Sequence, residues 1–144
     1  MNLIREGNIE EVVALSRAVP EFVQVYEEEA YVRRLSERLH LILIAEVDGT
    51  SAGFKVCYQS ETPGILYSWM GAVLPAYRKS GIARAMAESQ EAWARRHGFH
   101  TIRFKTRNRF VQMLHFGLSR GFRIVGFEKR GEVADYRILL EKQL

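Results

Sequence analysis

Apolar residues near the start of the chain recur at intervals of three and four, which is the spacing of one face of a helix. The first such run extends from Asn8 to Val19, and Glu11 completes the pattern of a helix capping box that begins at Asn8. A second run covers about 22–39, with glutamates and arginines on its other face. We therefore expect a short strand at Asn2–Arg5 followed by two helices.

The next residues are rich in β-branched and aromatic side chains. Leu41–Val47 and Ala52–Tyr58 flank Asp48-Gly49, a pair typical of a two-residue hairpin turn. A further strand is expected from Ile65 to about Val73.

In the second half of the chain, segments with the hydrophobic spacing of a helix are followed by segments with the alternating pattern of a strand. The expected elements are a helix over Gly81–His97, a strand over Thr101–Thr106, a helix over Asn108–Arg120, and strands over Arg123–Lys129 and Val133–Glu141. The order is βααβββαβαββ. It predicts an α+β fold in which about four helices flank a mixed, mostly antiparallel sheet of about seven strands.

Length and composition indicate one globular domain over residues 1–144. The chain is close to the ~150 residues of a typical domain, and 47% of its residues are hydrophobic, which excludes a disordered chain. Cys57 is the only cysteine, so an intrachain disulfide and a thiolate zinc cluster are excluded. The histidines lack metal-ligand spacing, and no metal is expected.

No segment near the start suits a membrane or a secretory signal. The longest early apolar run, Leu41–Ala45, is far shorter than the ~20 residues that span a bilayer. A cytoplasmic protein without a membrane partner is the expectation.

Positive charge is concentrated in one region of the chain. Residues 1–75 carry six Lys/Arg against eleven Asp/Glu, whereas residues 76–130 carry thirteen against three. Such a segment predicts a polyanionic partner: a nucleic acid, an anionic lipid, or a small molecule with several phosphates. A solvated basic face is the alternative.

The most informative stretch, Val73–Arg84, runs from a strand through a basic turn into a helix. The first amides of a helix lack intrahelical acceptors and the helix dipole is positive there, so an anion is stabilised. Gly81 lets the backbone approach such an anion, and Arg78, Lys79 and Arg84 add positive charge.

This stretch resembles motif A of the GNAT superfamily of acyl-CoA-dependent N-acetyltransferases, Arg/Gln-x-x-Gly-x-Gly/Ala. Arg78, Gly81 and Ala83 occupy its fixed positions. The predicted element order is also that of the family, and Asn108 followed by Gly121-Phe122 resembles its second motif. Only one of the three glycines of the dinucleotide-binding fingerprint is present.

The resemblance implies acetyl-CoA as co-substrate. Backbone amides of the motif would hold its pyrophosphate, the fourth strand would pair with its pantetheine arm, and the fourth and fifth strands would splay apart. Gly71 is the expected site of the accompanying bulge. The expected cofactor-binding residues are Ala72, Val73, Arg78, Lys79, Ser80, Gly81, Ile82, Ala83, Arg84 and Asn108.

The chain departs from the family at both proton-transfer positions. Many members place a carboxylate or histidine on the fourth strand as base, and here that position is about Tyr67. The usual acid is a tyrosine about four residues before Gly-Phe, and here Gly117 stands there. Tyr67 and His115 are the catalytic candidates, although a phenol with an ordinary pKa near 10 is a poor base at pH 7. Structural roles for both remain open, as does a water-mediated role for Glu46 or Glu28.

Gly117 also predicts close approach of another group, either a strand or the acyl end of the cofactor, because glycine is costly inside a helix.

The resemblance implies acetyl transfer to a primary amine by direct attack in a ternary complex. The acceptor would be a small molecule or a peptide, and the acidic stretch that includes Glu21 and Glu27–Glu29 favours a cationic amine. Two alternatives remain open: a non-catalytic acyl-CoA sensor, and a nucleic-acid surface where arginines alternate with Phe104 and Phe110. A nucleic-acid partner is not the expectation, and a homodimer is compatible with this class.

Overall fold

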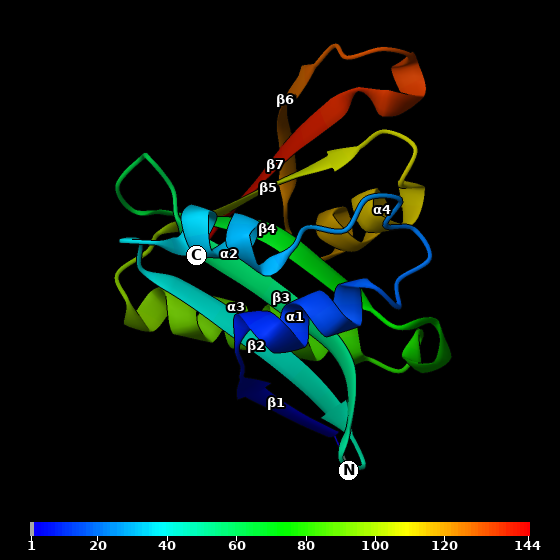
Figure 1. Ribbon diagram of the computed structural model, residues 1–144. Helices are drawn as coiled ribbons and strands as arrows, with labels where there is room; N and C mark the ends of the chain where they lie inside the picture. The colour runs from blue at the N-terminus through cyan, green and yellow to red at the C-terminus, as the bar shows by residue number, and fades with distance from the viewer. Residues whose placement is uncertain (1) are drawn as a thin grey trace.

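The computed structural model describes residues 2–144, which form a seven-stranded sheet with helices on both faces (Figure 1). The strands are β1 (Asn2–Glu6), β2 (His40–Val47), β3 (Thr50–Gln59), β4 (Ile65–Val73), β5 (Thr101–Arg107), β6 (Arg123–Glu128) and β7 (Arg137–Gln143). The helices are α1 (Ile9–Ser16), α2 (Glu28–Leu35), α3 (Ile82–Arg96) and α4 (Val111–Ser119), with short 3-10 turns η1 (Pro75–Tyr77) and η2 (Val133–Asp135). The predicted α+β class and element order are confirmed.

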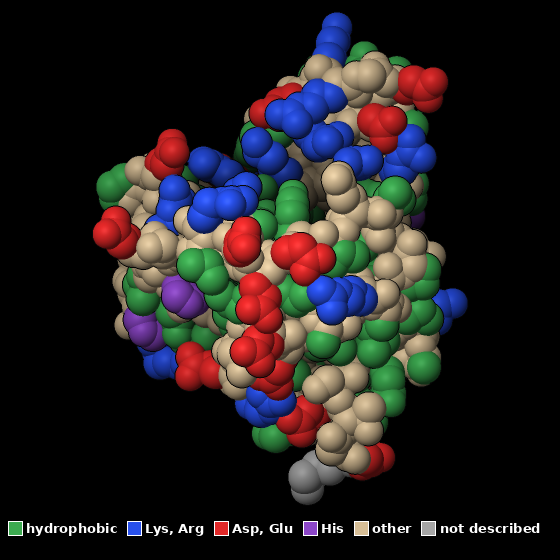
Figure 2. All heavy atoms as spheres, in the orientation of Figure 1, with side chains coloured by type: hydrophobic (Ala, Val, Ile, Leu, Met, Phe, Trp, Pro, Cys, Tyr) green, Lys and Arg blue, Asp and Glu red, His purple; other side chains and the backbone are tan. Residues whose placement is uncertain are grey.

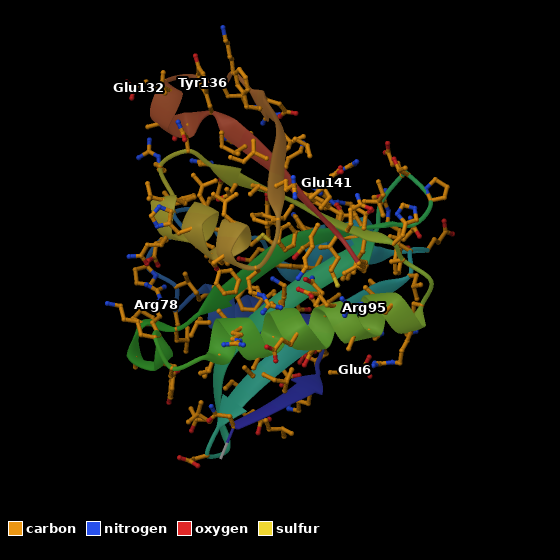
Figure 3. All side chains as sticks on the ribbon, turned by 180° about the vertical axis from the view of Figure 1, so that it is seen from behind. Glu6, Arg78, Arg95, Glu132, Tyr136 and Glu141 are labelled. Atoms are coloured by element: carbon orange, nitrogen blue, oxygen red, sulfur yellow. The ribbon has the colours of Figure 1, made fainter. Side chains whose placement is uncertain are left out.

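The strand order is β1-β2-β3-β4-β5-β7-β6, and β4 with β5 is the parallel pair. α1 and α2 cover one face of the sheet, where Val12, Tyr31 and Phe54 are fully buried. Helix α3 covers the other face, where Leu66 and Ile102 are fully buried, and α4 lies beside it (Figure 3). Each such side chain contributes about 1.5–3 kcal/mol through burial.

Local sequence chemistry explains the first helix and the hairpin. The Asn8 side chain accepts a hydrogen bond from the Glu11 amide at 2.9 Å, and the Asn8 amide donates to the Glu11 carboxylate at 3.1 Å. The capping box is therefore confirmed. Asp48 and Gly49 have φ values of 49° and 83°, as a two-residue turn between twisted strands requires.

The second helix is shorter than the sequence predicted. Residues 22–27 are irregular, and α2 begins only at Glu28. Phe22 packs edge-on against Phe54, and Tyr26 packs against Trp69. These contacts with the sheet determine the path of the segment and override its helical periodicity.

The last strand begins at Arg137, so the predicted start at Val133 was wrong. The preceding residues form η2, whose carbonyl groups are already engaged. The amides of Asn108 and Arg109 donate to the carbonyls of Tyr136 and Ala134 at 2.9 and 2.8 Å. The end of β5 thus holds this turn outside the sheet.

The bulge in β4 lies at Trp69, not at Gly71 as predicted. Met70 pairs with Val56 and Ser68 pairs with Cys57, so Trp69 is the extra residue. The extra residue shifts the alternation of side chains between the two faces of the sheet. As a result Trp69 and Met70 both pack toward α1 and α2.

Within residues 2–144, no helix is both long and apolar enough to cross a membrane. The same part of the chain contains no group of three or more His, Cys, Asp or Glu side chains placed to hold a metal ion.

Candidate active site

β4 and β5 separate partway along their length. They pair only where Ile65–Tyr67 meets Thr101–Arg103, and beyond this point they diverge (Figure 1). The remainder of β4, from Ser68 to Val73, has no strand on its β5 side. We call this gap the β4–β5 opening; it is the splay that the family resemblance implied.

Backbone groups of β4 remain available along the opening. The Leu74 amide donates to the Ala52 carbonyl at 2.8 Å, which sets the alternation of the ladder between β3 and β4. By this alternation Ala72 directs its backbone groups to β3, whereas Gly71 and Val73 direct theirs to the opening. Of the two residues predicted to pair with a cofactor arm, Val73 faces the opening and Ala72 faces β3; the Val73 carbonyl accepts a hydrogen bond from Arg78 Nε at 2.9 Å.

The turn into α3 presents a row of unpaired amides. Within residues 2–144, none of the backbone N–H groups from Lys79 to Arg84 donates to a protein acceptor. The helix has no side-chain cap and no acidic residue in its first turn. Lys79 and Gly81 both have positive φ, 62° and 85°, a turn geometry that gathers successive amides around an anion. Lys79, Ser80, Gly81, Ile82, Ala83 and Arg84 form what we call the amide cradle.

Arg78 does not face the amide cradle. Its guanidinium donates two hydrogen bonds to the carboxylate of Glu21, at 2.7 and 2.8 Å, and its Nε donates to the Val73 carbonyl at 2.9 Å. The hydrogen bonds from Arg78 lower the pKa of Glu21. The side chain therefore links the connection between α1 and α2 to the end of β4, and Figure 3 labels it beside the turn before α3.

The side chain of Asn108 is engaged with η2. Its amide nitrogen donates to the Val133 carbonyl at 3.2 Å. Asn108 thus helps to hold the β6–β7 connection in place, and its contact with the cofactor stays a prediction.

His115 is exposed on α4. It lies two residues from Gly117, about 200° around the helix, and Gly117 is the buried position that packs on the sheet. The structure therefore places His115 on the outer face of α4, away from the sheet. A Cβ at Gly117 would lie 2.8 Å from the ring of Phe104, so the close approach predicted there comes from a strand. Phe104 is buried, and it is not available as a stacking surface for nucleic acid.

Tyr67 stands where β4 and β5 separate. Its ring packs edge-on against Tyr58, with centroids 5.5 Å apart, and within residues 2–144 its hydroxyl has no hydrogen-bond partner. Burial raises the pKa of the Tyr67 phenol, Tyr58 and Glu128 add to the rise, and Arg34 opposes it. The phenol is therefore protonated at neutral pH, which disfavours the predicted role as base and leaves a hydrogen-bond donor at the opening.

Aromatic rings surround the bulge on the side of α2. Tyr26 and Tyr31 lie 5.7 and 5.0 Å from the Trp69 ring, measured between centroids. The Arg34 guanidinium stacks over Trp69 at 4.6 Å and donates to the Tyr58 hydroxyl at 3.0 Å. Arg34 follows Tyr31 by three residues, so both project from one face of α2. This spacing was a usable sequence signal for Arg34, which the predicted site lacked.

The opposite wall belongs to β5, β6 and β7. Ile102, Phe104 and Thr106 are buried on the face that α3 and α4 cover, so Arg103, Lys105 and Arg107 project from the other face, toward the side of α1 and α2. Figure 2 shows a hollow between α2 and these strands, with Lys and Arg side chains gathered along both sides.

Glu128 of β6 is a residue of this wall that sequence reasoning missed. Its Oε2 lies 3.5 Å from Lys105, and its charge reaches Tyr67, whose pKa it raises. Its Oε1 is a buried atom without a hydrogen bond, although Arg130 lies 3.4 Å away. No local motif marks this residue, because the pairing of β6 with β7 determines its position.

The glutamates predicted to make the acceptor region acidic do not gather at the opening. Glu21 pairs with Arg78 and Glu27 pairs with Arg17. Glu28 lines a separate hollow that includes Glu10. The structure thus gives no support to an acidic acceptor pocket.

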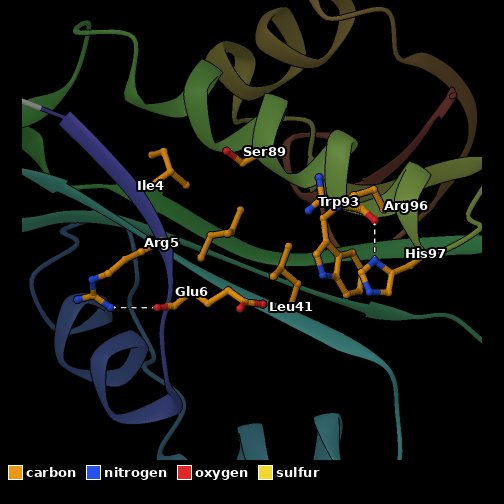
Figure 4. A pocket seen from close by; sticks show the side chains of 9 residues that line it. Ile4, Arg5, Glu6, Leu41, Ser89, Trp93, Arg96 and His97 are labelled. Atoms are coloured by element: carbon orange, nitrogen blue, oxygen red, sulfur yellow. Dashed lines mark hydrogen bonds between the residues drawn. The ribbon is translucent and has the colours of Figure 1, made fainter.

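A groove of about 490 Å³ lies between β1 and α3, on the far side of β2 and β3 from the opening (Figure 4). Trp93 and His97 stack in it with ring centroids 4.1 Å apart, and the His97 ring is hydrogen-bonded to the Trp93 carbonyl. None of the residues predicted for the site lines this groove.

Comparison with known proteins identifies the class. Residues 10–122 match the model of the acetyltransferase (GNAT) family, and the chain belongs to this family of acetyltransferases. No curated protein matches the chain.

Several solved structures share the fold. The ribosomal-protein-S18-alanine N-acetyltransferase from Escherichia coli is 17% identical, with a TM-score of 0.85 over 99% of this chain and 94% of that one. Ard1 from Thermoplasma volcanium is 16% identical, with a TM-score of 0.84 over 99% and 97% of the two chains. A GNAT family acetyltransferase from Elizabethkingia anophelis with acetyl-CoA bound is 18% identical, with a TM-score of 0.77 over 99% and 98%.

Proposed function

We propose that this protein transfers the acetyl group of acetyl-CoA to a primary amine. The observation that carries the proposal is the position of the amide cradle at the end of β4, directly after the stretch where β4 has lost its partner on the β5 side. Membership of the acetyltransferase family supports it, as does the related structure whose description includes bound acetyl-CoA.

The residues present fit the cofactor. Six consecutive unpaired amides suit a diphosphate, and Lys79 and Arg84 add positive charge beside them. The backbone of Gly71 and the amide of Val73 are available to pair with an amide-containing arm, as an added strand would, whereas the Val73 carbonyl already accepts from Arg78 Nε. Acetyl-CoA bound in this way supplies an activated acetyl thioester.

Transfer to an amine forms a C–N bond and breaks the C–S bond. One proton must leave the acceptor ammonium, and one must reach the departing sulfur. The protonated hydroxyl of Tyr67 can donate a hydrogen bond in the opening. Glu128 Oε1 makes no hydrogen bond to the described residues and can accept one from an ammonium, in competition with Arg130, which lies 3.4 Å away. Positioning of the two substrates in one opening provides the rest of the acceleration.

A second candidate is an acyl-CoA sensor without catalysis. It is favoured by Gly117, which occupies the position of the usual tyrosine acid and is packed against Phe104. Both candidates require the same amide cradle, so only turnover separates them.

Calorimetry with acetyl-CoA, followed by an assay of thiol release with an amine panel, tests the proposal. Binding with amine-dependent thiol release supports the enzyme, and binding without release from any amine supports the sensor. No heat with acetyl-CoA at millimolar concentration would refute both. A cytoplasmic location and a homodimer stay predictions.

A further inference from the structure

The side of the β4–β5 opening formed by α2 carries a positive charge that no carboxylate neutralises. Within residues 2–144, Arg34 has no acidic partner, and its one hydrogen bond goes to the hydroxyl of Tyr58. On the opposite wall, by contrast, Arg103 pairs with Glu141 at 2.6 Å and Lys105 pairs with Glu128 at 3.5 Å.

The Arg34 guanidinium is also held in one orientation. Its plane lies over Trp69 at 4.6 Å, and the hydrogen bond to Tyr58 at 3.0 Å fixes one edge. A guanidinium has five N–H donors, so most of them remain available to a ligand. Two parallel donors match the two oxygens of a carboxylate or a phosphate, and a fixed guanidinium loses little entropy on binding.

The aromatic surface next to Arg34 belongs to the opening itself. Trp69 is the bulged residue on the stretch of β4 that has no β5 partner, and Tyr67 ends the paired stretch. Both rings are only partly buried, and Tyr26 beside them is 43% exposed. An apolar ligand body therefore has a surface to pack on between Arg34 and the thioester position.

Charge at the two ends of this surface differs in sign. Arg34 belongs to α2 and Glu128 to β6, and both charges act on the pKa of the Tyr67 phenol. An acceptor amine needs an acceptor group for its ammonium. Glu128 Oε1 makes no hydrogen bond within the described part of the chain, and its ion pairs with Lys105 and Arg130 are long, at 3.5 and 3.4 Å. A molecule with an anion at one end and an ammonium at the other matches this arrangement.

We infer that the acceptor is a small amine that also carries a carboxylate or a phosphate, and that Arg34 binds this anionic group while Trp69 and Tyr67 pack against the body of the molecule. The inference rests on the proposed function and deepens it. It replaces the cationic acceptor expected from the sequence, since the glutamates behind that expectation are paired or distant from the opening.

The test uses matched amines that differ only in the anionic group: phenylalanine with phenethylamine, lysine with cadaverine, and O-phosphoethanolamine with ethanolamine. Each is titrated by calorimetry into the full chain saturated with coenzyme A. We expect at least one anionic member to bind about tenfold or more tightly than its partner, as a bidentate charged hydrogen bond provides. A gain with the amino acids identifies a carboxylate, and a gain with O-phosphoethanolamine alone identifies a phosphate.

Variants assign the gain to Arg34. Arg34→Gln should abolish it, and Arg34→Lys, which keeps the charge but not the fork, should retain part of it. The control is Arg33→Gln, a neighbouring exposed arginine of α2, which should leave the gain unchanged. Acetyl-CoA binding is measured on the same samples and should be equal in all of them.

Two results would overturn the inference: no gain in any pair, or a gain that persists in Arg34→Gln. If acetyl-CoA still binds in either case, only the acceptor class is wrong. If acetyl-CoA fails to bind the wild-type chain, the proposed function itself is wrong.

Discussion

The guanidinium of Arg78 and the carboxylate of Glu21 form a two-point ion pair across 57 positions of the chain, with hydrogen bonds of 2.7 and 2.8 Å. The pair joins the connection between α1 and α2 to the turn before α3, so it links the acceptor side of the opening to the amide cradle. The sequence motif marks Arg78 as a cofactor residue, whereas the structure gives its side chain this tethering role.

A double-mutant cycle of Glu21→Gln and Arg78→Gln should measure a coupling of about 0.5–1 kcal/mol in the free energy of unfolding at pH 7, because both side chains are more than a third exposed. The pKa of Glu21 is lowered in the folded state, so the coupling is present above the unfolded carboxyl pKa and is lost as pH falls through the folded value. The more exposed pair of Arg17 with Glu27 is the control and should give less. A coupling that persists at pH 2 would contradict this account.

An acidic residue in place of Ala83 should raise the stability of the fold and lower its affinity for acetyl-CoA. Ala83 is exposed in the first turn of α3. Ala83→Asp should stabilise the helix start by about 0.3–1 kcal/mol, yet it should weaken acetyl-CoA binding at least about tenfold by repelling the diphosphate. Thermal melts and calorimetry measure the two effects, and the neutral Ala83→Asn is the matched control. An unchanged affinity of Ala83→Asp for acetyl-CoA would show that the amide cradle does not bind the cofactor.

Removal of the Tyr67 hydroxyl should slow turnover without unfolding the protein. Tyr67→Phe should lower kcat/KM by about 100-fold, the contribution of one placed proton donor. The pKa of the phenol is raised, so the wild-type rate should fall only as pH rises beyond about 10, the ordinary phenol value. Tyr67→Phe should lack this basic limb. If Tyr67→Phe has the wild-type kcat/KM, the Tyr67 hydroxyl has no catalytic role and the residue contributes only packing.

Loss of the Glu128 carboxylate should affect the acceptor and not the cofactor. Glu128→Gln should lower kcat/KM for the amine by about 10–100-fold while the affinity for acetyl-CoA stays constant. The control is Glu132→Gln, at an exposed residue of the β6–β7 connection. Equal losses in the two variants would point to the charge of the whole wall rather than to Glu128.

Among the carboxylates, Glu91 of α3 should cause the largest loss in the free energy of unfolding when it is removed. It is buried, and it accepts hydrogen bonds from Lys142 of β7 at 2.9 Å and from Arg120 after α4 at 3.0 Å. Glu91→Gln leaves Lys142 without this carboxylate and Arg120 with the longer contact to Glu88, at 3.8 Å, and it should destabilise the fold by about 3 kcal/mol, roughly 6–12 °C in Tm. Glu88→Gln, at an exposed position of the same helix, should cost less than about 1 kcal/mol.

Glu91 should also account for part of the acid sensitivity. Burial acts to raise its pKa, but the hydrogen bonds from Lys142 and Arg120 outweigh burial and lower it. Its contribution to stability is thus present above the unfolded pKa near 4.3 and is lost as pH falls through the lower folded value. A wild-type melting temperature as insensitive to acid as that of Glu91→Gln would contradict this assignment.

The sequence predicted the features that depend on near neighbours in the chain. The capping box at Asn8, the turn at Asp48-Gly49 and the helix start at Gly81 are all encoded within a few residues. What it missed depends on packing between distant segments. Phe22 and Tyr26 shorten α2 through contacts with the sheet, and an extra residue relative to β3 moves the bulge to Trp69.

The same distinction applies to the site. The amide cradle follows from a local motif, so its position was predictable. The spacing from Tyr31 puts Arg34 on the same face of α2, but whether this face meets the opening depends on how α2 packs. The position of Glu128 depends on how β6 pairs with β7, which no spacing along the chain specifies. The sequence marked Asn108 and His115 but not the direction of their side chains, which depends on the contact with η2 and on the packing of α4.

The contact of Gly117 with Phe104 restricts how this chain could acquire the acid that its relatives use. The ring of Phe104 fills the space that any larger side chain at 117 would need, so Gly117→Tyr alone would force the helix off the sheet. A smaller residue at 104 would first have to open that space, at the expense of a buried aromatic side chain. A larger side chain at 117 therefore depends on a prior change at 104, so the two positions are coupled through one contact between α4 and β5.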